Sequence, residues 1–363
     1  MALAQGSSAT TLPSILQLSL GAPAESGRSH LSFALEEHGI GVETFHLPRG
    51  RKPALIAGVL RNAPSFSDYA AVVATEYTLA FAAGLRSILT RSQTPVIALG
   101  LNLSGSVIRT NAPLLGSLCD MPFRRLALNV VHSRREMGLF QELHHISDDR
   151  MAFAHWGFDL PEYDNLRFSD RGPYVCMVGR NNRDFKTFCD AVAIAGINGV
   201  IIAPSYAQFD FDVPPSVEIY RDLPFADCLS CIQHSIANLI LVKDDARGAG
   251  HITAVASMLL GAPQIYTKAE VISDYLVDGV TALPVPLGDA EAVANAIRRV
   301  REGGEAIRAM AQKAKSYAER WLSHKTTAGR QADLIVSAIR RVPFAAVDPQ
   351  WQSAFDELVG GDQ

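Results

Sequence analysis

Residues 248–286 read GAGHITAVASMLLGAPQIYTKAEVISDYLVDGVTALPVP, and this stretch is the most informative in the chain. A short Gly-rich loop enters a helix that we expect to open at Thr253 and to end near Gly261. A strand is expected to follow at residues 263–266. A Gly-rich loop at the start of a helix presents backbone N–H groups and the positive end of the helix dipole. The stretch therefore predicts a loop–helix–strand unit with an anion-binding loop.

The same alternation of strand-like and helix-like segments continues through most of the chain. Strands are expected at residues 14–20, 41–46, 69–74, 95–99, 125–131 and 151–154, and again at 174–178, 199–203, 217–220, 238–242 and 263–266. Apolar strands that alternate with helices favour parallel sheets. We therefore predict an α/β fold of two Rossmann-like domains that face a cleft.

The expected boundary is the polar, turn-rich segment at residues 159–172, DLPEYDNLRFSDRG, which we interpret as a linker. We expect one domain at 1–165 and a second at 166–325. A last helix is expected at residues 325–341, and the C-terminal part of the chain, 326–363, is expected to pack back on the first domain.

Composition restricts the class of protein. The chain has 363 residues, 48% of them hydrophobic and 19% charged, with a net charge of −4. This argues against a nucleic-acid partner. No apolar run reaches the ~18 residues of a membrane span, and the first residues lack the features of a signal peptide. We expect a cytoplasmic protein. Cys228, Cys231 and His234 fit no complete metal or haem motif, and we interpret the cysteines as buried structural thiols.

Two cations follow the expected strand at 174–178. Gly179 and Arg180 come directly after it, and Lys186 lies in the first turn of the next helix. Two cations beside a helix N-terminus would hold a diphosphate. The alternative is a pair of solvated surface cations. Open α/β sheets bind ligands at the C-terminal ends of their strands, which favours the diphosphate clamp.

The chain resembles the GT-B glycosyltransferases, and most of all the large retaining family with a Glu-x7-Glu signature. The resemblance covers most of the chain and is more extensive in the second half. It rests on Gly179, Arg180 and Lys186, the Gly-rich loop and its helix, the segment 278–283, the segment HWGFD at 155–159, and Val131-His132-Ser133.

The resemblance implies an acceptor-binding first domain and a nucleotide-sugar-binding second domain. The donor-binding residues would be Gly179, Arg180, Lys186, Gly248, Gly250, His251, Ile252 and Thr253. The reaction would move a hexose-type sugar from a nucleotide-diphosphate sugar to a hydroxyl of a carbohydrate, lipid-linked or protein acceptor, in glycan or glycolipid synthesis. Cations and helix N–H groups would stabilise the departing diphosphate, with no metal or other cofactor.

The chain departs from the family at both signature glutamates, which would fall at Gly248 and Ala256. Three readings stay open: a divergent enzyme, an enzyme with substitute donor-binding groups, or a catalytically inactive binding subunit. A sugar-nucleotide epimerase is a further alternative. His251 is a candidate substitute that would donate to a phosphate oxygen and stabilise the leaving diphosphate. Otherwise it satisfies local backbone groups. Thr253 is expected to cap the helix.

The first domain supplies candidates for the acceptor side. Glu76 follows an apolar strand and is either a general base for an inverting reaction or an ordinary acid at a helix N-terminus. Arg28, Asn102 and Ser104 are candidates for acceptor binding. The basic pairs 124–125 and 134–135 would contact an anionic membrane or a lipid diphosphate at the inner face of the membrane, or be solvated surface.

Overall fold

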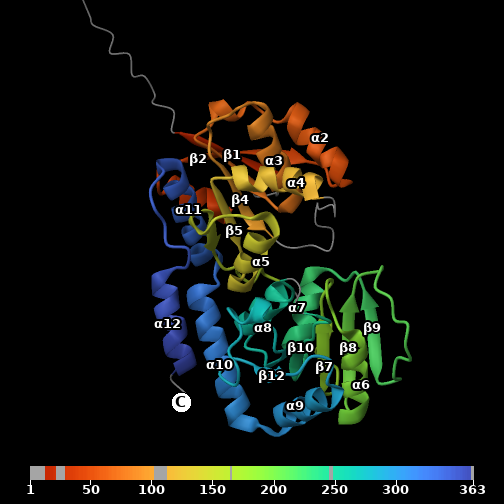
Figure 1. The fold of residues 1–363 in the computed structure, drawn as a ribbon. Helices are drawn as coiled ribbons and strands as arrows, with labels where there is room; N and C mark the ends of the chain where they lie inside the picture. The colour runs from red at the N-terminus through yellow and green to blue at the C-terminus, as the bar shows by residue number, and fades with distance from the viewer. Residues whose placement is uncertain (1–12, 22–28, 102–112, 164–165, 245–247, 361–363) are drawn as a thin grey trace, which may run out of the picture.

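The computed structural model describes residues 13–21, 29–101, 113–163, 166–244 and 248–360. The first half forms a six-stranded parallel sheet in the order β2-β1-β3-β4-β5-β6 (Figure 1). Its strands are β1 (Ser14–Leu20), β2 (Gly41–Leu47), β3 (Ala71–Thr75), β4 (Val96–Leu101), β5 (Leu128–Val131) and β6 (Met151–Phe153). Its helices are α1 (His30–Glu36), α2 (Lys52–Asn62), α3 (Tyr77–Leu89), α4 (Pro113–Arg125) and α5 (Arg134–His144), with short 3₁₀ turns η1 (Phe66–Asp68) and η2 (Asp148–Arg150).

The second half forms another six-stranded parallel sheet, in the order β12-β11-β10-β7-β8-β9. Its strands are β7 (Tyr174–Val178), β8 (Asn198–Ala203), β9 (Val217–Arg221), β10 (Ala237–Ile240), β11 (Gln264–Thr267) and β12 (Leu283–Val285). The helices are α6 (Phe185–Ala195), α7 (Phe225–His234), α8 (His251–Leu260), α9 (Ala290–Glu302), α10 (Gly304–Trp321), α11 (His324–Arg340) and α12 (Pro349–Gly360), with the 3₁₀ turn η3 (Glu270–Ile272). The predicted α/β fold with two Rossmann-like sheets is confirmed.

Burial on both faces explains why central strands such as β3 and β7 read as continuous apolar runs. All four residues AVVA of β3 are buried, because helices cover the sheet on both sides. The second sheet likewise separates two apolar clusters. In the described part of the chain, no helix is long and apolar enough to cross a membrane.

The C-terminal helices return to the first half of the chain. Helix α11 packs against α1, and its Leu334 and Ile335 are buried with Ile15 of β1. The helix expected at 325–341 is therefore not the last one, since α12 follows and buries Trp351 near Phe153 of β6. Figure 1 shows α11 beside the upper sheet and α12 beside α10. The division of the chain at residue 165 stays a prediction.

Three local features differ from the sequence predictions. Helix α2 was not predicted, and it forms because Leu55 and Val59 are buried on one face. The strand expected at 125–131 begins only at Leu128, since Arg125 ends α4. Helix α8 begins at His251, two residues before the expected start, with Gly250 as its N-cap in the left-handed region at φ +98°.

Candidate functional site

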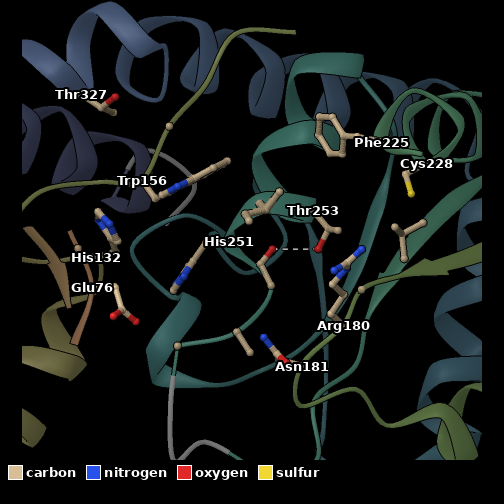
Figure 2. Close-up of a pocket in the computed structure, with 18 of the residues that line it drawn as sticks. Glu76, His132, Trp156, Arg180, Asn181, Phe225, Cys228, His251, Thr253 and Thr327 are labelled. Carbon is tan, nitrogen blue, oxygen red and sulfur yellow. Dashed lines mark hydrogen bonds between the residues drawn. The ribbon is translucent and has the colours of Figure 1, made fainter. Parts of the chain in front are cut away.

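A cavity of about 900 Å³ lies between the two sheets, and both halves of the chain line it (Figure 2). From the first half it takes Glu76 after β3, Gly100 in β4 and His132 after β5. From the second it takes the loop after β7 and the N-terminus of α8. Because the C-terminal ends of strands from both sheets meet here, the cavity is at the place where open α/β sheets bind ligands.

Arg183 places a buried positive charge at the wall of the cavity. Its side chain is only 5% exposed, and burial lowers the pKa of its guanidinium to about 10, so the group stays charged. Nη1 donates to the carbonyl oxygen of Asn181 at 3.0 Å, and Nη2 donates to Oγ1 of Thr253 at 3.2 Å. Among the described residues no carboxylate forms an ion pair with it, and its Nε has no hydrogen-bond partner. A buried cation without a counter-charge is costly, so the site is suited to an anion.

Gly179 makes room for this guanidinium. A Cβ atom at residue 179 would overlap Nε and Nη2 of Arg183. The glycine that follows β7 therefore allows Arg183 to turn inward across the end of the strand. Sequence analysis did not single out Arg183, although it is the second arginine in the same short loop.

The Gly-rich loop and α8 face Arg183 across the same end of the sheet. Gly248, Gly250, Ile252 and Thr253 line the cavity. No side chain caps α8. The expected cap, Thr253, is instead the third residue of the helix, where its Oγ1 donates to the carbonyl oxygen of Gly250 at 3.0 Å and accepts from Arg183. The N-terminal N–H groups of α8 therefore add to the positive character of this wall.

The loop is held by a carboxylate from the other half of the chain. The backbone N–H of Gly248 donates to Oε1 of Glu136 in α5 at 3.2 Å, and Glu136 is fully buried. A Cβ at residue 248 would lie 2.7 Å from the same oxygen. The space that a side chain at residue 248 would use is thus occupied by a glutamate from α5.

His251 lines the cavity, and its ring makes a hydrogen bond to the backbone. Its Nε2 lies 2.8 Å from the carbonyl oxygen of Val271, which can only accept, so Nε2 carries the hydrogen and donates. Burial lowers the pKa of the His251 ring to about 4. The centroid of this ring lies 4.5 Å from the centroid of the Tyr275 ring. A neutral ring with its donor already used does not donate to a phosphate. This geometry supports the alternative reading, in which His251 satisfies a backbone group.

Glu76 lies in the cavity and begins α3. Its Oε1 accepts from the backbone N–H of Leu79 at 3.3 Å, so it is the N-cap of that helix. Burial raises the pKa of the carboxyl group. Its backbone has φ +116° and ψ +161°, a region used almost only by glycine. Strain of this kind, at a strand end that faces a cavity, is typical of functional sites.

The solved structures similar to this chain share its two-sheet architecture. Anabaena HepE in complex with UDP aligns with a TM-score of 0.66 at 16% identity, over 90% of this chain and 100% of that one. Sucrose-phosphate synthase from Thermosynechococcus elongatus aligns with a TM-score of 0.68 at 15% identity, over 91% and 100%. A glycosyltransferase from Rickettsia africae gives 0.64 at 11% identity, over 91% and 99%. The chain has the GT-B fold. No protein-family model and no curated protein sequence matches it.

Within this GT-B fold, not every expected residue reaches the cavity between the domains. Arg180 lines it and is exposed to solvent. Lys186 lies outside it: the side chain is 63% exposed and bonds Asp190 at 2.6 Å, one turn along α6. Arg28, Asn102 and Ser104 lie outside the described residues, and their role in acceptor binding stays a prediction.

One end of the cavity between the two sheets is apolar. Phe225, the first residue of α7, is 44% exposed and forms an edge contact with Phe158. Figure 2 shows Phe225 and Cys228 above Arg180 and away from Glu76. Ile202 and Ala203 complete this end. An apolar slot beside a cationic wall suits a planar ring attached to an anionic group.

One group of side chains in the described residues could hold a metal ion, and it lies at the rim of the cavity. It consists of His30, Asp159 and His324. The two imidazole rings are stacked at 4.2 Å with 21° between their planes, so their in-plane lone pairs run nearly parallel and do not converge. The backbone N–H of Asp159 donates to Nδ1 of His324, and the backbone N–H of His324 donates to Oδ1 of Asp159. This arrangement fits a contact between linker and α11 better than a metal site.

The basic pairs of the first domain are engaged within the protein. Arg134 bonds Asp274 through Nε at 2.5 Å, and Arg135 pairs with Glu270 at 3.2 Å. Arg125 donates to the carbonyl oxygen of Ser92, and Arg124 lies 4.0 Å from Asp120. These contacts leave little support for the expected membrane contact through these arginines.

Proposed function

We propose that the chain is a glycosyltransferase that binds a nucleotide-diphosphate sugar in this cavity and transfers the sugar to an acceptor hydroxyl. The observation that carries the proposal is Arg183, a buried cation that has no carboxylate partner among the described residues and is directed at the N-terminus of α8. The donor diphosphate would complete this site, because charge-assisted bonds from a guanidinium and helix N–H groups suit phosphate oxygens.

The orientation of the donor follows from the two ends of the cavity. The base would lie in the apolar slot beside Phe225, and the sugar would point toward Glu76 and His132 in the first domain. Structures of HepE with UDP and with UDP-glucose, in a chain of the same fold, support this donor class. Charge for the departing diphosphate would come from Arg183, Arg180 and α8, so the proposed reaction needs no metal.

The proposal treats the chain as a divergent relative of the Glu-x7-Glu glycosyltransferases. The first signature glutamate of that family would fall at Gly248. We propose that Glu136 replaces it, because the carboxylate of Glu136 lies beside the position that a Cβ atom at residue 248 would take. The acceptor would be a carbohydrate, lipid-linked or protein hydroxyl at the first domain. A cytoplasmic location, at the inner face of the membrane for a lipid-linked acceptor, belongs to the same proposal.

A ligand panel tests the function. UDP, GDP, ADP and their glucose conjugates are each added, and the melting temperature is measured. A ligand that binds only the native state raises it. NMR then follows the stabilising sugar nucleotide with and without a mixture of mono- and disaccharide acceptors.

Transfer of the sugar supports the proposal. An epimerised sugar nucleotide formed without acceptor would instead identify an epimerase. Binding without any turnover would identify a binding subunit, and no shift with any nucleotide would contradict the donor site itself.

A further inference from the structure

The apolar end of the cavity carries a carboxylate, Asp222, to which the sequence analysis gave no role. Asp222 follows β9 directly and lines the cavity together with Ile202, Ala203 and Phe225. Its backbone N–H donates to the carbonyl oxygen of Ala203 at 3.0 Å, so it lies beside the end of β8. Phe225 begins α7 three residues later and lies at this end of the cavity in Figure 2. The carboxylate therefore borders the slot in which the base of the donor would lie.

Hydrogen bonds across the ends of β8 and β9 fix the position of this carboxylate. Oδ2 of Asp222 accepts from the backbone N–H of Ser205, in the loop after β8, at 3.0 Å. The neighbouring Arg221 holds the same loop, since its Nη1 donates to the carbonyl oxygens of Pro204 at 2.9 Å and Ala207 at 2.8 Å. Asp222 has φ +48°, in the left-handed region that aspartate and asparagine adopt more readily than most residues. The carboxylate is thus held in place by the protein itself.

The carboxylate is charged and can accept further hydrogen bonds. A hydrogen bond from the side chain of Ser205 lowers the pKa of Asp222, which keeps the group ionised at neutral pH. An ionised carboxylate has about four acceptor positions, so the bonds to Ser205 leave others for a ligand. Asp222 is exposed in the cavity, where a ligand can reach these positions. Because the group is negative and only accepts, it would repel a phosphate and bind N–H or O–H donors.

The nucleotide bases differ in the edge that they would present to such a group. Guanine presents its N1–H and an N–H of its 2-amino group side by side, so these two donors match the two oxygens of a carboxylate. Uracil presents a single N–H between two carbonyl oxygens, which a carboxylate repels. Adenine presents an amino group beside a ring nitrogen with a lone pair, which a carboxylate also repels. Parallel charge-assisted hydrogen bonds therefore favour guanine.

We propose that Asp222 selects a guanosine-diphosphate sugar as the donor, with its carboxylate accepting from N1–H and from the 2-amino group of guanine; this inference rests on the proposed function. The guanine ring fills the apolar slot beside Phe225, and the diphosphate extends toward Arg183. The rival partner for the same carboxylate is the pair of ribose hydroxyls, which are also donors. Since every ribonucleotide carries them, a ribose contact predicts no preference between bases.

Inosine diphosphate is the most direct probe, because inosine is guanosine without the 2-amino group. Calorimetry on the whole protein compares the affinities for GDP, IDP, UDP and ADP. We expect GDP to bind most tightly, roughly ten- to a hundredfold more tightly than IDP, since IDP lacks one charge-assisted bond. Equal affinity for GDP and IDP, or tightest binding of UDP or ADP, would overturn the assignment of Asp222 and leave the donor site standing.

Asp222→Asn tests the residue itself. Asparagine keeps an oxygen for the N–H of Ser205 and tolerates the left-handed backbone, but it removes the charge and one acceptor oxygen. We expect the affinity for GDP to fall roughly ten- to a hundredfold and to approach that for IDP, while the affinities for UDP and ADP change little. Asp289→Asn is the matched control, because Oδ1 of Asp289 also accepts a backbone N–H, from Ala292 at 2.9 Å, and Asp289 lies outside the cavity. It should leave all four affinities unchanged.

An unchanged ratio of GDP to IDP affinity in Asp222→Asn would contradict the assignment. So would an equal loss of affinity for all four nucleotides, which would identify a ribose contact. If Asp222→Asn does not fold, which its melting curve shows, the comparison of GDP with IDP on the wild type decides alone. Failure of the wild type to bind any nucleoside diphosphate would overturn the proposed function, and the assignment of the base with it.

Discussion

At the end of β3, Glu76 combines a capping side chain with a backbone conformation that only glycine adopts without strain. Such strain costs about 1–3 kcal/mol, whereas replacing a capping residue by glycine costs only a few tenths. Glu76→Gly should therefore raise the free energy of unfolding by about 1–2 kcal/mol, measured by denaturant titration. A less stable variant would show that the side chain contributes more than the strain costs.

His251 makes stability depend on pH. Its pKa is lowered by burial from 6.5 to about 4, so below pH 6.5 the unfolded chain binds a proton that the folded chain does not. This stability is complete above pH 6.5 and is lost as the pH falls toward 4, at about 1.4 kcal/mol per pH unit. Unfolding curves at pH 7, 6 and 5 measure the slope. His251→Gln keeps a donor for Val271 and should have a smaller slope, and equal slopes would contradict this account.

At the residue scale, the sequence did not predict which cation after β7 points into the cavity. A cation after β7 could be predicted from the sequence, and Arg180 and Lys186 were the candidates. Which cation turns inward depends on the start of α6: Arg183 precedes the helix and crosses Gly179, while Lys186 follows its start and points to solvent. The sequence placed Lys186 in the first turn of that helix, but the space above Gly179 that lets Arg183 turn inward is a property of the fold.

Helices α3 and α4 are in contact through a glycine. A Cβ at Gly84 would overlap the carbonyl of Pro122, so the helices approach more closely than any other residue would allow. Gly84→Ala should destabilise the protein by about 1–3 kcal/mol, since overpacking forces backbone shifts. Gly138 in α5 is a matched control, because its Cβ would meet nothing within 4 Å. Gly138→Ala should stabilise by about 0.5–1 kcal/mol. Equal effects in thermal melts would contradict the close contact.

Elements were predicted well where the apolar pattern was long and less well where tertiary contacts decide. The central strands of both sheets, such as β3 and β7, were found because they are buried on both faces, whereas the short strand β12 was not predicted. Helix α2 was missed because Gly58 weakens its local pattern, and the packing of Leu55 and Val59 stabilises the helix. The start of α8 was misplaced because its N-cap is Gly250, which has no capping side chain.

Over the whole molecule, the two halves are joined by contacts that no local pattern predicts. Arg134 of α5 bonds Asp274 through both its backbone N–H and its Nε. Its Nη1 also donates to Gln352 of α12. Since these residues are 140 and 218 positions away from Arg134, the sequence could indicate two domains and a cleft but not the residues that join them.

The central claim is that Arg183 holds a nucleotide diphosphate in the cavity between the sheets, and calorimetric titration with UDP, GDP and ADP tests it. Arg183→Met should weaken binding of the preferred nucleotide roughly ten- to a hundredfold, since a charge-assisted contact is lost. Without nucleotide, the Arg183→Met protein should remain folded, because the substitution replaces a buried cation that has no counter-charge by an apolar side chain. Lys186→Met is the matched control, with its exposed side chain outside the cavity. Unchanged affinity in Arg183→Met, or an equal loss in Lys186→Met, would contradict the account.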